Sequence, residues 1–228
     1  MNANRSMIRR AIVGGAALVA VLALVLFVSA RSVNYWQAWL YLFIFTLATS
    51  AISLYLIARD PALMERRLRA GPAAETELAQ QIIQSVASVS FLLIYVVAGL
   101  DRRFGWSSVS DAFVLAGDVL VVLGFWIVFL TFRENSHASA TIEVGKDQPV
   151  ISTGPYAVVR HPMYAGAGIL IFASAPALGS PWSLVPAIAL MAGIVWRLID
   201  EERFLSTNLP GYAEYCRQTR YRLIPSIW

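Results

Sequence analysis

The segment TGPYAVVRHPMYAG, residues 153–166, concentrates side chains that can do chemistry in a chain that is otherwise apolar. It contains Arg160 and His161, and only one other histidine occurs in the chain. Pro162 biases His161 toward an extended conformation, yet it suits the first turn of a helix that begins there. The free backbone N–H groups of such a turn bind anionic groups readily. The spacing therefore predicts a rigid, semi-polar rim at the start of a helix, with two tyrosines as its walls.

These residue types also have an ordinary interpretation. Tyrosine, arginine and proline are common anchors where a helix meets the membrane interface, and a lone histidine there is usually hydrated. The spacing of the segment is compatible with both a binding site and a set of anchors.

A second cluster of charge, residues 200–202 (DEE), follows the last strongly apolar segment and lies between Arg197 and Arg203. Carboxylates at the C-terminal end of a helix oppose the helix macrodipole, at a cost of about 0.3–1 kcal/mol. They are therefore expected to have a cationic partner, either the basic tail or a ligand. A solvated helix end is the alternative.

A single carboxylate, Asp118, interrupts the apolar run 113–132. Charges inside a membrane are costly and are by default functional candidates. Because this position lies toward the outer side, far from the other candidate residues, we expect Asp118 to cap a helix or to form a hydrogen bond within the bundle.

The composition indicates an integral membrane protein. Of the 228 residues, 58% are hydrophobic and 14% are charged, whereas soluble domains carry about 25% charged residues. The mean hydropathy is +0.62. The net charge of +4 is spread over loops, so it does not indicate nucleic-acid binding. With Cys216 alone and two histidines, neither an intramolecular disulfide nor a Cys/His metal site is expected.

Six apolar segments predict an all-α, polytopic helical bundle with about six transmembrane helices. Spanning a bilayer takes about 20 apolar residues, and the candidates are residues 8–30, 36–58, 78–100, 113–132, 164–178 and 182–199. The first run exceeds the apolar core of a signal peptide, so we predict an uncleaved helix. The polar tail, residues 201–228, is expected to fold onto the helix ends. We divide the chain into a four-helix membrane region, 1–132, and a catalytic region, 133–228.

Basic residues predict the orientation of the helices. If the N-terminus is inside, all but three of the 18 basic residues fall in inner segments. The three exceptions are Arg31, Arg102 and Arg103. The positive-inside rule then places both termini in the cytoplasm. No P-loop, H-E-x-x-H or G-x-S-x-G is present, and soluble-type nucleotide domains are excluded.

Five segments in order resemble the isoprenylcysteine carboxyl methyltransferase family. They are GPYAVVRHPMYAG (154–166), LGSPW (178–182), EERFL (201–205), GYAEY (211–215) and RYRLIP (220–225). The related phospholipid methyltransferases share the same C-terminal half. The resemblance covers about residues 130–228, and NSHASATIEV before the first segment is similar to bacterial members. It implies a bacterial inner-membrane enzyme.

The resemblance also implies a cofactor, S-adenosylmethionine, and a set of residues that hold it. The implied cofactor-binding residues are Tyr156, Arg160, His161, Pro162, Tyr164, Glu201, Glu202, Tyr212 and Tyr215. A tail arginine is implied to face the substrate carboxylate, and its candidates are Arg217, Arg220 and Arg222. We take Arg220, Arg222 and Glu202 as the predicted catalytic residues.

The implied reaction is methyl transfer to a lipophilic acceptor, such as the carboxylate of an isoprenylcysteine or of another isoprenoid or lipid. A carboxylate is already ionised at neutral pH, so the protein must mainly align the reactants. Three alternatives remain open: a phospholipid amine N-methyltransferase, an NADPH-dependent reductase of sterol-like substrates with related membrane architecture, and a lipid-binding scaffold. Membrane lipids are expected partners, and nucleic acid is not.

Overall fold

The computed structural model describes residues 2–228 except 72, 74, 76, 143 and 146–147. The described residues form helices and connecting loops and contain no strand. The elements in chain order are α1 (Asn2–Ala30), α2 (Trp36–Arg59), α3 (Pro61–Arg67), α4 (Leu78–Phe104), α5 (Asp111–Glu134), η2 (Gly154–Ala157), α6 (Pro162–Ala177), η3 (Pro181–Ser183), α7 (Leu184–Asn208) and α8 (Tyr212–Gln218). The predicted all-α class is confirmed.

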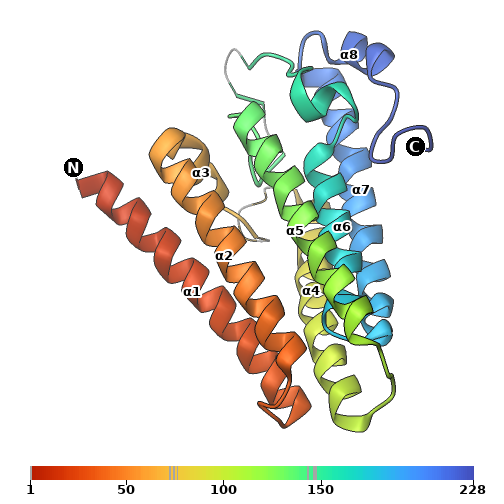
Figure 1. The fold of residues 1–228 in the computed structure, drawn as a ribbon. Helices are drawn as coiled ribbons and strands as arrows, with labels where there is room; N and C mark the ends of the chain where they lie inside the picture. Colours follow the sequence, from red (N-terminus) through yellow and green to blue (C-terminus); the bar gives the residue numbers. More distant parts are fainter. Residues whose placement is uncertain (1, 72, 74, 76, 143, 146–147) are drawn as a thin grey trace.

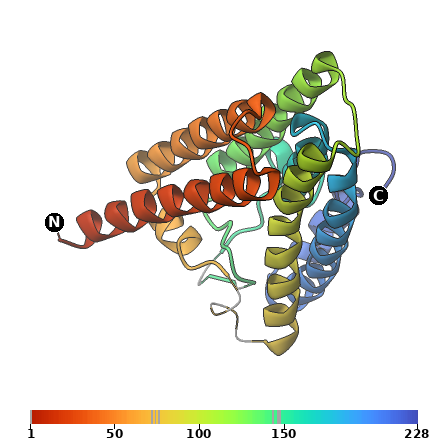
Figure 2. The same cartoon turned by 90° about the horizontal axis from the view of Figure 1, so that it is seen from below.

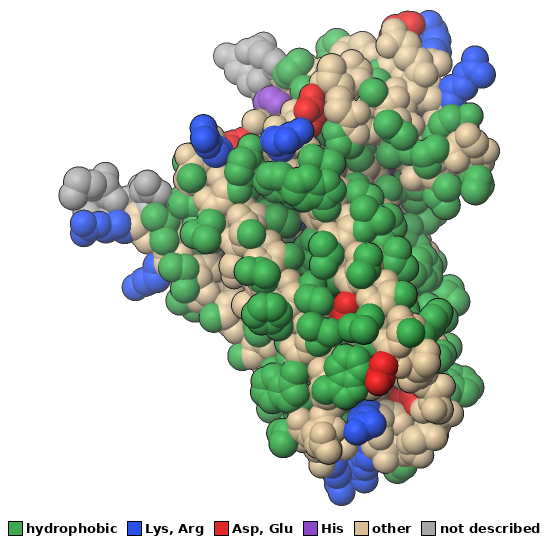
Figure 3. All heavy atoms as spheres, viewed as in Figure 1, with side chains coloured by type: hydrophobic (Ala, Val, Ile, Leu, Met, Phe, Trp, Pro, Cys, Tyr) green, Lys and Arg blue, Asp and Glu red, His purple; other side chains and the backbone are tan. Residues whose placement is uncertain are grey.

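Five helices of the described chain, α1, α2, α4, α5 and α7, are long and apolar enough to cross a membrane. The sixth, α6, has 16 residues and rises about 24 Å, short of a typical hydrocarbon core of about 30 Å. Hydrophobic side chains cover the middle of the molecule, and the basic ones gather toward its two ends (Figure 3). The chain is an integral membrane protein.

Helices α1, α2, α4, α5, α6 and α7 form a closed ring. Going around the ring, α1 packs against α2, α2 against α5, α5 against α6, α6 against α7, α7 against α4, and α4 against α1. Seen along the bundle, α1 lies beside α2 and α4 lies beside α7 (Figure 2). Both termini lie at one end of the bundle, together with α3 and α8 (Figure 1). The cytoplasmic location of that end stays a prediction.

Local sequence signals set several helix boundaries. The Asp60 carboxylate accepts a hydrogen bond from the Leu63 backbone N–H at 2.9 Å, and Pro61 occupies the first turn of α3. Pro162 begins α6 in the same manner, after His161 with φ −125°. The predicted start of a helix at Pro162 is confirmed.

One boundary prediction is wrong. The acidic residues 200–202 do not end the last transmembrane helix, because α7 continues to Asn208. The macrodipole therefore does not oppose them, since its effect is confined to the last turn. The sequence after residue 199 has no apolar run that would predict a helix. This polar part of α7 is instead stabilised by contacts with the tail and with the α5–α6 loop.

Asp118 also departs from expectation. Its side chain is buried in α5, and neither carboxylate oxygen has a hydrogen-bond partner among the described residues. The hydrogen bond predicted for Asp118 is therefore not formed with any described residue.

Close contact between α5 and α6 depends on glycine. A Cβ atom on Gly117 would lie 2.5 Å from the Ala177 backbone nitrogen, and one on Gly124 would lie 2.9 Å from the Gly166 carbonyl oxygen. Backbone atoms cannot move aside as a flexible side chain can. The missing side chains thus let the two helices touch, as is common between membrane helices.

We expect Gly117→Ala to destabilise the protein by about 1–3 kcal/mol, the usual cost of overpacking. The thermal unfolding midpoint of the detergent-purified protein should fall by several degrees. Gly14→Ala is the matched control, because a Cβ at Gly14 meets no atom within 4 Å. Equal midpoints for the two variants would contradict the close-packing argument.

Candidate functional site

The residues that precede α6 pair with the C-terminal tail through the backbone. The Arg160 N–H donates to the Tyr221 carbonyl at 2.8 Å, and the His161 N–H donates to the Arg222 carbonyl at 3.0 Å. Arg160 and His161 precede the first residue of α6, and Pro162 restricts the backbone of His161. Their N–H groups pair with the tail and not within the helix. The predicted docking of the tail on the helix ends is confirmed.

Glu202 is the ionic centre of this junction. Its Oε1 lies 3.0 Å from Arg160 Nη1 and 3.2 Å from His161 Nε2, and its Oε2 accepts a hydrogen bond from Arg222 Nε at 2.7 Å. The Glu202 side chain is 10% exposed. One carboxylate of α7 therefore joins the loop before α6 to the tail.

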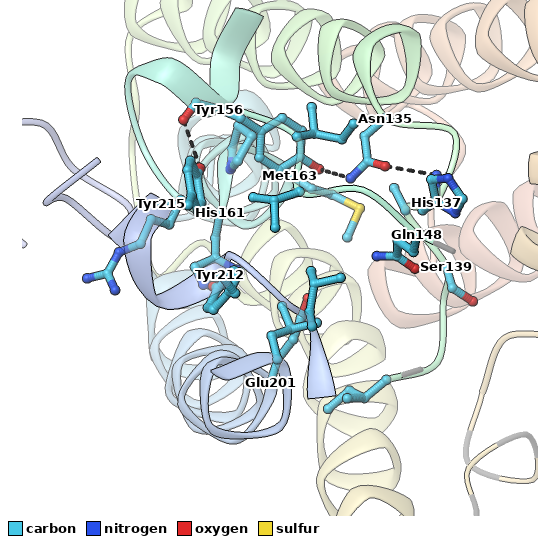
Figure 4. Close-up of a pocket in the computed structure, with 18 of the residues that line it drawn as sticks. Asn135, His137, Ser139, Gln148, Tyr156, His161, Met163, Glu201, Tyr212 and Tyr215 are labelled. Atoms are coloured by element: carbon cyan, nitrogen blue, oxygen red, sulfur yellow. Dashed lines mark hydrogen bonds between the residues drawn. The ribbon is translucent and has the colours of Figure 1, made fainter. Parts of the chain in front are cut away.

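A polar cavity lies next to this junction and is enclosed by α7, α8, the start of α6 and the loop 135–151 (Figure 4). Among its lining residues are eight of the predicted cofactor-binding residues: Tyr156, Arg160, His161, Pro162, Tyr164, Glu201, Tyr212 and Tyr215. The ninth, Glu202, is not among them. Its carboxylate lies behind the wall, held by the three basic side chains.

Consecutive carboxylates thus have different surroundings. Glu201 lines the cavity and accepts a hydrogen bond from the Tyr164 hydroxyl at 2.6 Å. No arginine, lysine or histidine lies within 4 Å of the Glu201 carboxylate in the described part of the chain. Glu201 is therefore the acidic group that can take a cationic ligand.

Two of the residues that line the cavity carry polar atoms that lack partners. The Tyr212 hydroxyl and Arg160 Nε are buried and make no hydrogen bond to any described residue. Unsatisfied buried donors are unusual in folded proteins and often mark a ligand site. Together with the Glu201 acceptor, these donors are groups of the kind that the amino-acid and nucleoside ends of S-adenosylmethionine would pair with.

Three tyrosines, Tyr156, Tyr212 and Tyr215, line the polar cavity. The Tyr156 hydroxyl accepts from Asn135 Nδ2 at 2.9 Å, and the Tyr215 hydroxyl donates to the Tyr156 carbonyl at 2.8 Å (Figure 4). Burial raises the pKa of Tyr156 to about 12 and also raises the pKa values of Tyr212 and Tyr215. All three therefore remain protonated phenols at neutral pH and act as neutral hydrogen-bonding groups.

A second cavity, of about 630 Å³, lies between α1, α2, α4, α5, α6 and α7 and opens to the surface of the bundle. Its walls are mainly apolar and come from both predicted regions, with Leu18 and Phe45 from the first and Leu170 and Ile194 from the second. At its far end the Tyr41 hydroxyl lies 2.9 Å from the Tyr95 hydroxyl and 2.8 Å from Ser174 Oγ. This volume falls within the range of about 300–1,000 Å³ that is typical of ligand pockets.

The two cavities adjoin each other. Ser139, Met163, Tyr164 and Arg197 line both of them. The polar cavity itself measures about 100 Å³, which is below the typical ligand range. As it stands, the polar cavity is smaller than a nucleoside-sized ligand requires.

Sequence reasoning missed a polar network beneath the cavity. Arg197 Nη1 lies 2.7 Å from Glu75 Oε1 and donates to Gln80 Oε1 at 3.0 Å, while Arg197 Nη2 donates to the Ala140 carbonyl at 2.8 Å. Gln80 Nε2 donates to Asp200 at 3.1 Å. Arg197, an arginine inside an apolar helix, was the available signal. Its partners come from a distant loop and from α4, so no spacing could identify them.

The tail arginines lie apart from both cavities. Arg222 pairs with Glu202, Arg217 pairs with Glu214 at 2.8 Å, and Arg220 is exposed. None of the three lines either cavity. Their predicted role toward a substrate carboxylate, and that of Glu202 in catalysis, stay predictions.

Comparisons with known proteins agree with part of the resemblance. Residues 112–210 match the family model described as phospholipid methyltransferase. Over 135 residues the chain is 33% identical to the cobalt-zinc-cadmium resistance protein CzcN of Cupriavidus metallidurans, and this alignment covers 58% of the chain and 57% of that protein. The chain thus aligns with just over half of that relative. The matches support the phospholipid methyltransferase family, which isoprenylcysteine carboxyl methyltransferases share, and not the narrower assignment.

Proposed function

We propose that this protein is a membrane-embedded methyltransferase that uses S-adenosylmethionine and methylates a lipophilic acceptor. The observation that carries the proposal is the pair of adjoining cavities, one polar and one apolar, with Met163 and Tyr164 between them. The match of residues 112–210 to phospholipid methyltransferases supports the same reaction class. A polar methyl donor and an apolar acceptor need two such compartments that meet.

When bound, S-adenosylmethionine supplies a sulfonium methyl group, whose C–S bond breaks as an acceptor lone pair forms the new bond to carbon. Glu201 would bind the cofactor's amine or offset its positive charge. Arg160 and Tyr212 would donate hydrogen bonds from the buried atoms that lack partners. The chain's main contribution is alignment, which is worth about 7–11 kcal/mol in favourable cases.

The acceptor that we propose first is a carboxylate, on an isoprenylcysteine-like compound or another isoprenoid or lipid. Its lone pair is available without proton removal, and no general base is needed. A phospholipid amine is the second candidate, favoured by the family description. An amine must lose a proton, and Glu201 is the carboxylate that lines the polar cavity.

We expect S-adenosylhomocysteine to bind the detergent-purified protein with a measurable heat in isothermal titration calorimetry, because the polar cavity offers unpaired donors and a carboxylate. NADPH is expected to give no binding heat under the same conditions. Heat from NADPH with none from S-adenosylhomocysteine would replace the proposal with the reductase alternative. The absence of binding heat from both ligands, measured on folded protein, would favour the lipid-binding scaffold.

A further inference from the structure

Arg67 is a half-buried arginine that differs in position from Arg160, Arg197 and Arg222. It ends α3, and its guanidinium reaches the wall of the apolar cavity. There Arg67 Nη1 donates to the Ser139 carbonyl at 3.1 Å and lies 3.8 Å from Met163 Sδ. Ser139 and Met163 line both cavities, whereas Arg67 lines the apolar cavity alone. Arg67 therefore lies where the two cavities meet, on the side of the apolar one.

Arg67 forms no close ion pair with any described carboxylate, and the Glu201 charge acts on it only at longer range. Arg160 and Arg222 share Glu202, and Arg197 pairs with Glu75. No carboxylate of the described residues lies within 4 Å of Arg67, and its Cζ lies 5.0 Å from the centre of the Phe132 ring. Burial lowers the pKa of Arg67. A cation facing an apolar space is costly unless an anion joins it.

We propose that Arg67, rather than a tail arginine, binds the anionic head group of the acceptor. This inference rests on the proposed function and makes the acceptor an amphiphile with a carboxylate or phosphate at one end. The arginine fork suits two oxygens of either group. A head group held at the junction leaves the chain to extend through the helix ring toward Ser174, ten residues and about 15 Å beyond Tyr164 along α6.

The test measures binding of matched single-chain amphiphiles in the absence of cofactor. Purified full-length protein in phosphatidylcholine nanodiscs is titrated with hexadecanoate, hexadecyl phosphate, hexadecanol and hexadecylamine, in competition with tritiated hexadecanoate. We expect at least one anion to bind about tenfold or more tightly than the alcohol and the amine, as for a charge-assisted hydrogen bond in a partly dry site. Tighter binding of hexadecanoate identifies a carboxylate, and tighter binding of the phosphate identifies a phosphate head group.

Variants assign this preference to a residue. Arg67→Gln should remove it, and Arg67→Lys should retain part of it because the charge remains without the fork. Arg69→Gln is the matched control, since the Arg69 side chain is 72% exposed two residues away. Equal binding of the anions and the alcohol by the wild type, or a preference that survives in Arg67→Gln, overturns the inference. If Arg67→Gln cannot be purified, the wild-type series and Arg67→Lys decide it.

A separate titration with S-adenosylhomocysteine distinguishes a failure of the proposed function from a failure of the role proposed for Arg67. Arg67→Gln should bind it as the wild type does, because Arg67 does not line the polar cavity. Failure of the wild type to bind it counts against the proposed function. Normal cofactor binding without an anion preference counts against the role of Arg67 alone.

Discussion

Glu202→Ala is expected to release the C-terminal tail and to abolish both cofactor binding and turnover. Glu202 joins Arg160 and His161 to Arg222 in a region where its side chain is 10% exposed. Removing one partner of a buried ionic network costs about 3–5 kcal/mol, because the remaining charges are left uncompensated. Here three basic groups would face one another, and the wall of the polar cavity would open.

Two measurements check this expectation. Limited proteolysis should cleave the tail of Glu202→Ala rapidly, and calorimetry should detect no binding of S-adenosylhomocysteine. Glu214→Ala is the matched control, since Glu214 is a tail carboxylate that is 57% exposed and pairs with Arg217 alone. A protease-resistant tail together with lost turnover would instead assign Glu202 a direct role in catalysis, as the sequence resemblance implies.

Glu201→Gln is expected to weaken cofactor binding strongly while leaving the fold intact. The Glu201 side chain lines the polar cavity, accepts a hydrogen bond from Tyr164 at 2.6 Å, and has no basic side chain of the described residues within 4 Å. Glutamine retains an acceptor for the tyrosine and removes only the charge. A charged hydrogen bond is worth about 1.5–3 kcal/mol, which corresponds to about 10- to 100-fold in the dissociation constant.

The choice of ligand identifies what Glu201 binds. Equal weakening toward S-adenosylmethionine and S-adenosylhomocysteine indicates the amine, which both ligands carry. Greater weakening toward S-adenosylmethionine indicates the sulfonium, which it alone carries. The control is Asp200→Asn, because Asp200 hydrogen-bonds to Gln80 and Arg203 and does not line the polar cavity. Unchanged affinity of Glu201→Gln for both ligands would remove Glu201 from the cofactor site.

The carboxylate and amine alternatives for the acceptor differ in what they require of this site. A carboxylate acceptor needs Arg67 for position and no proton transfer. An amine acceptor needs a base, and Glu201→Gln would then lower turnover at saturating cofactor as well as affinity. Turnover measured on both acceptor types with the Arg67 and Glu201 variants therefore separates the two reactions.

The sequence by itself determined the class of the protein, its long helices and the start of α6. Apolar runs near the length of a bilayer admit only helices, because backbone polar groups in lipid must be satisfied within their own segment. Pro162 set a local boundary by restricting the backbone before it. The segment 153–166 and residues 201–202 were recognised from their order along the chain, which matches that of a family.

Only the tertiary structure decided how these residues divide their work. Glu201 and Glu202 are neighbours in sequence, yet helical geometry turns one toward the cavity and the other toward Arg160, His161 and Arg222. Closure of α4 and α7 with the other helices into a ring creates the apolar cavity. The position of Arg67 beside Ser139 and Met163 follows from that closure. Contacts between segments so far apart in the chain depend on packing, which no local pattern encodes.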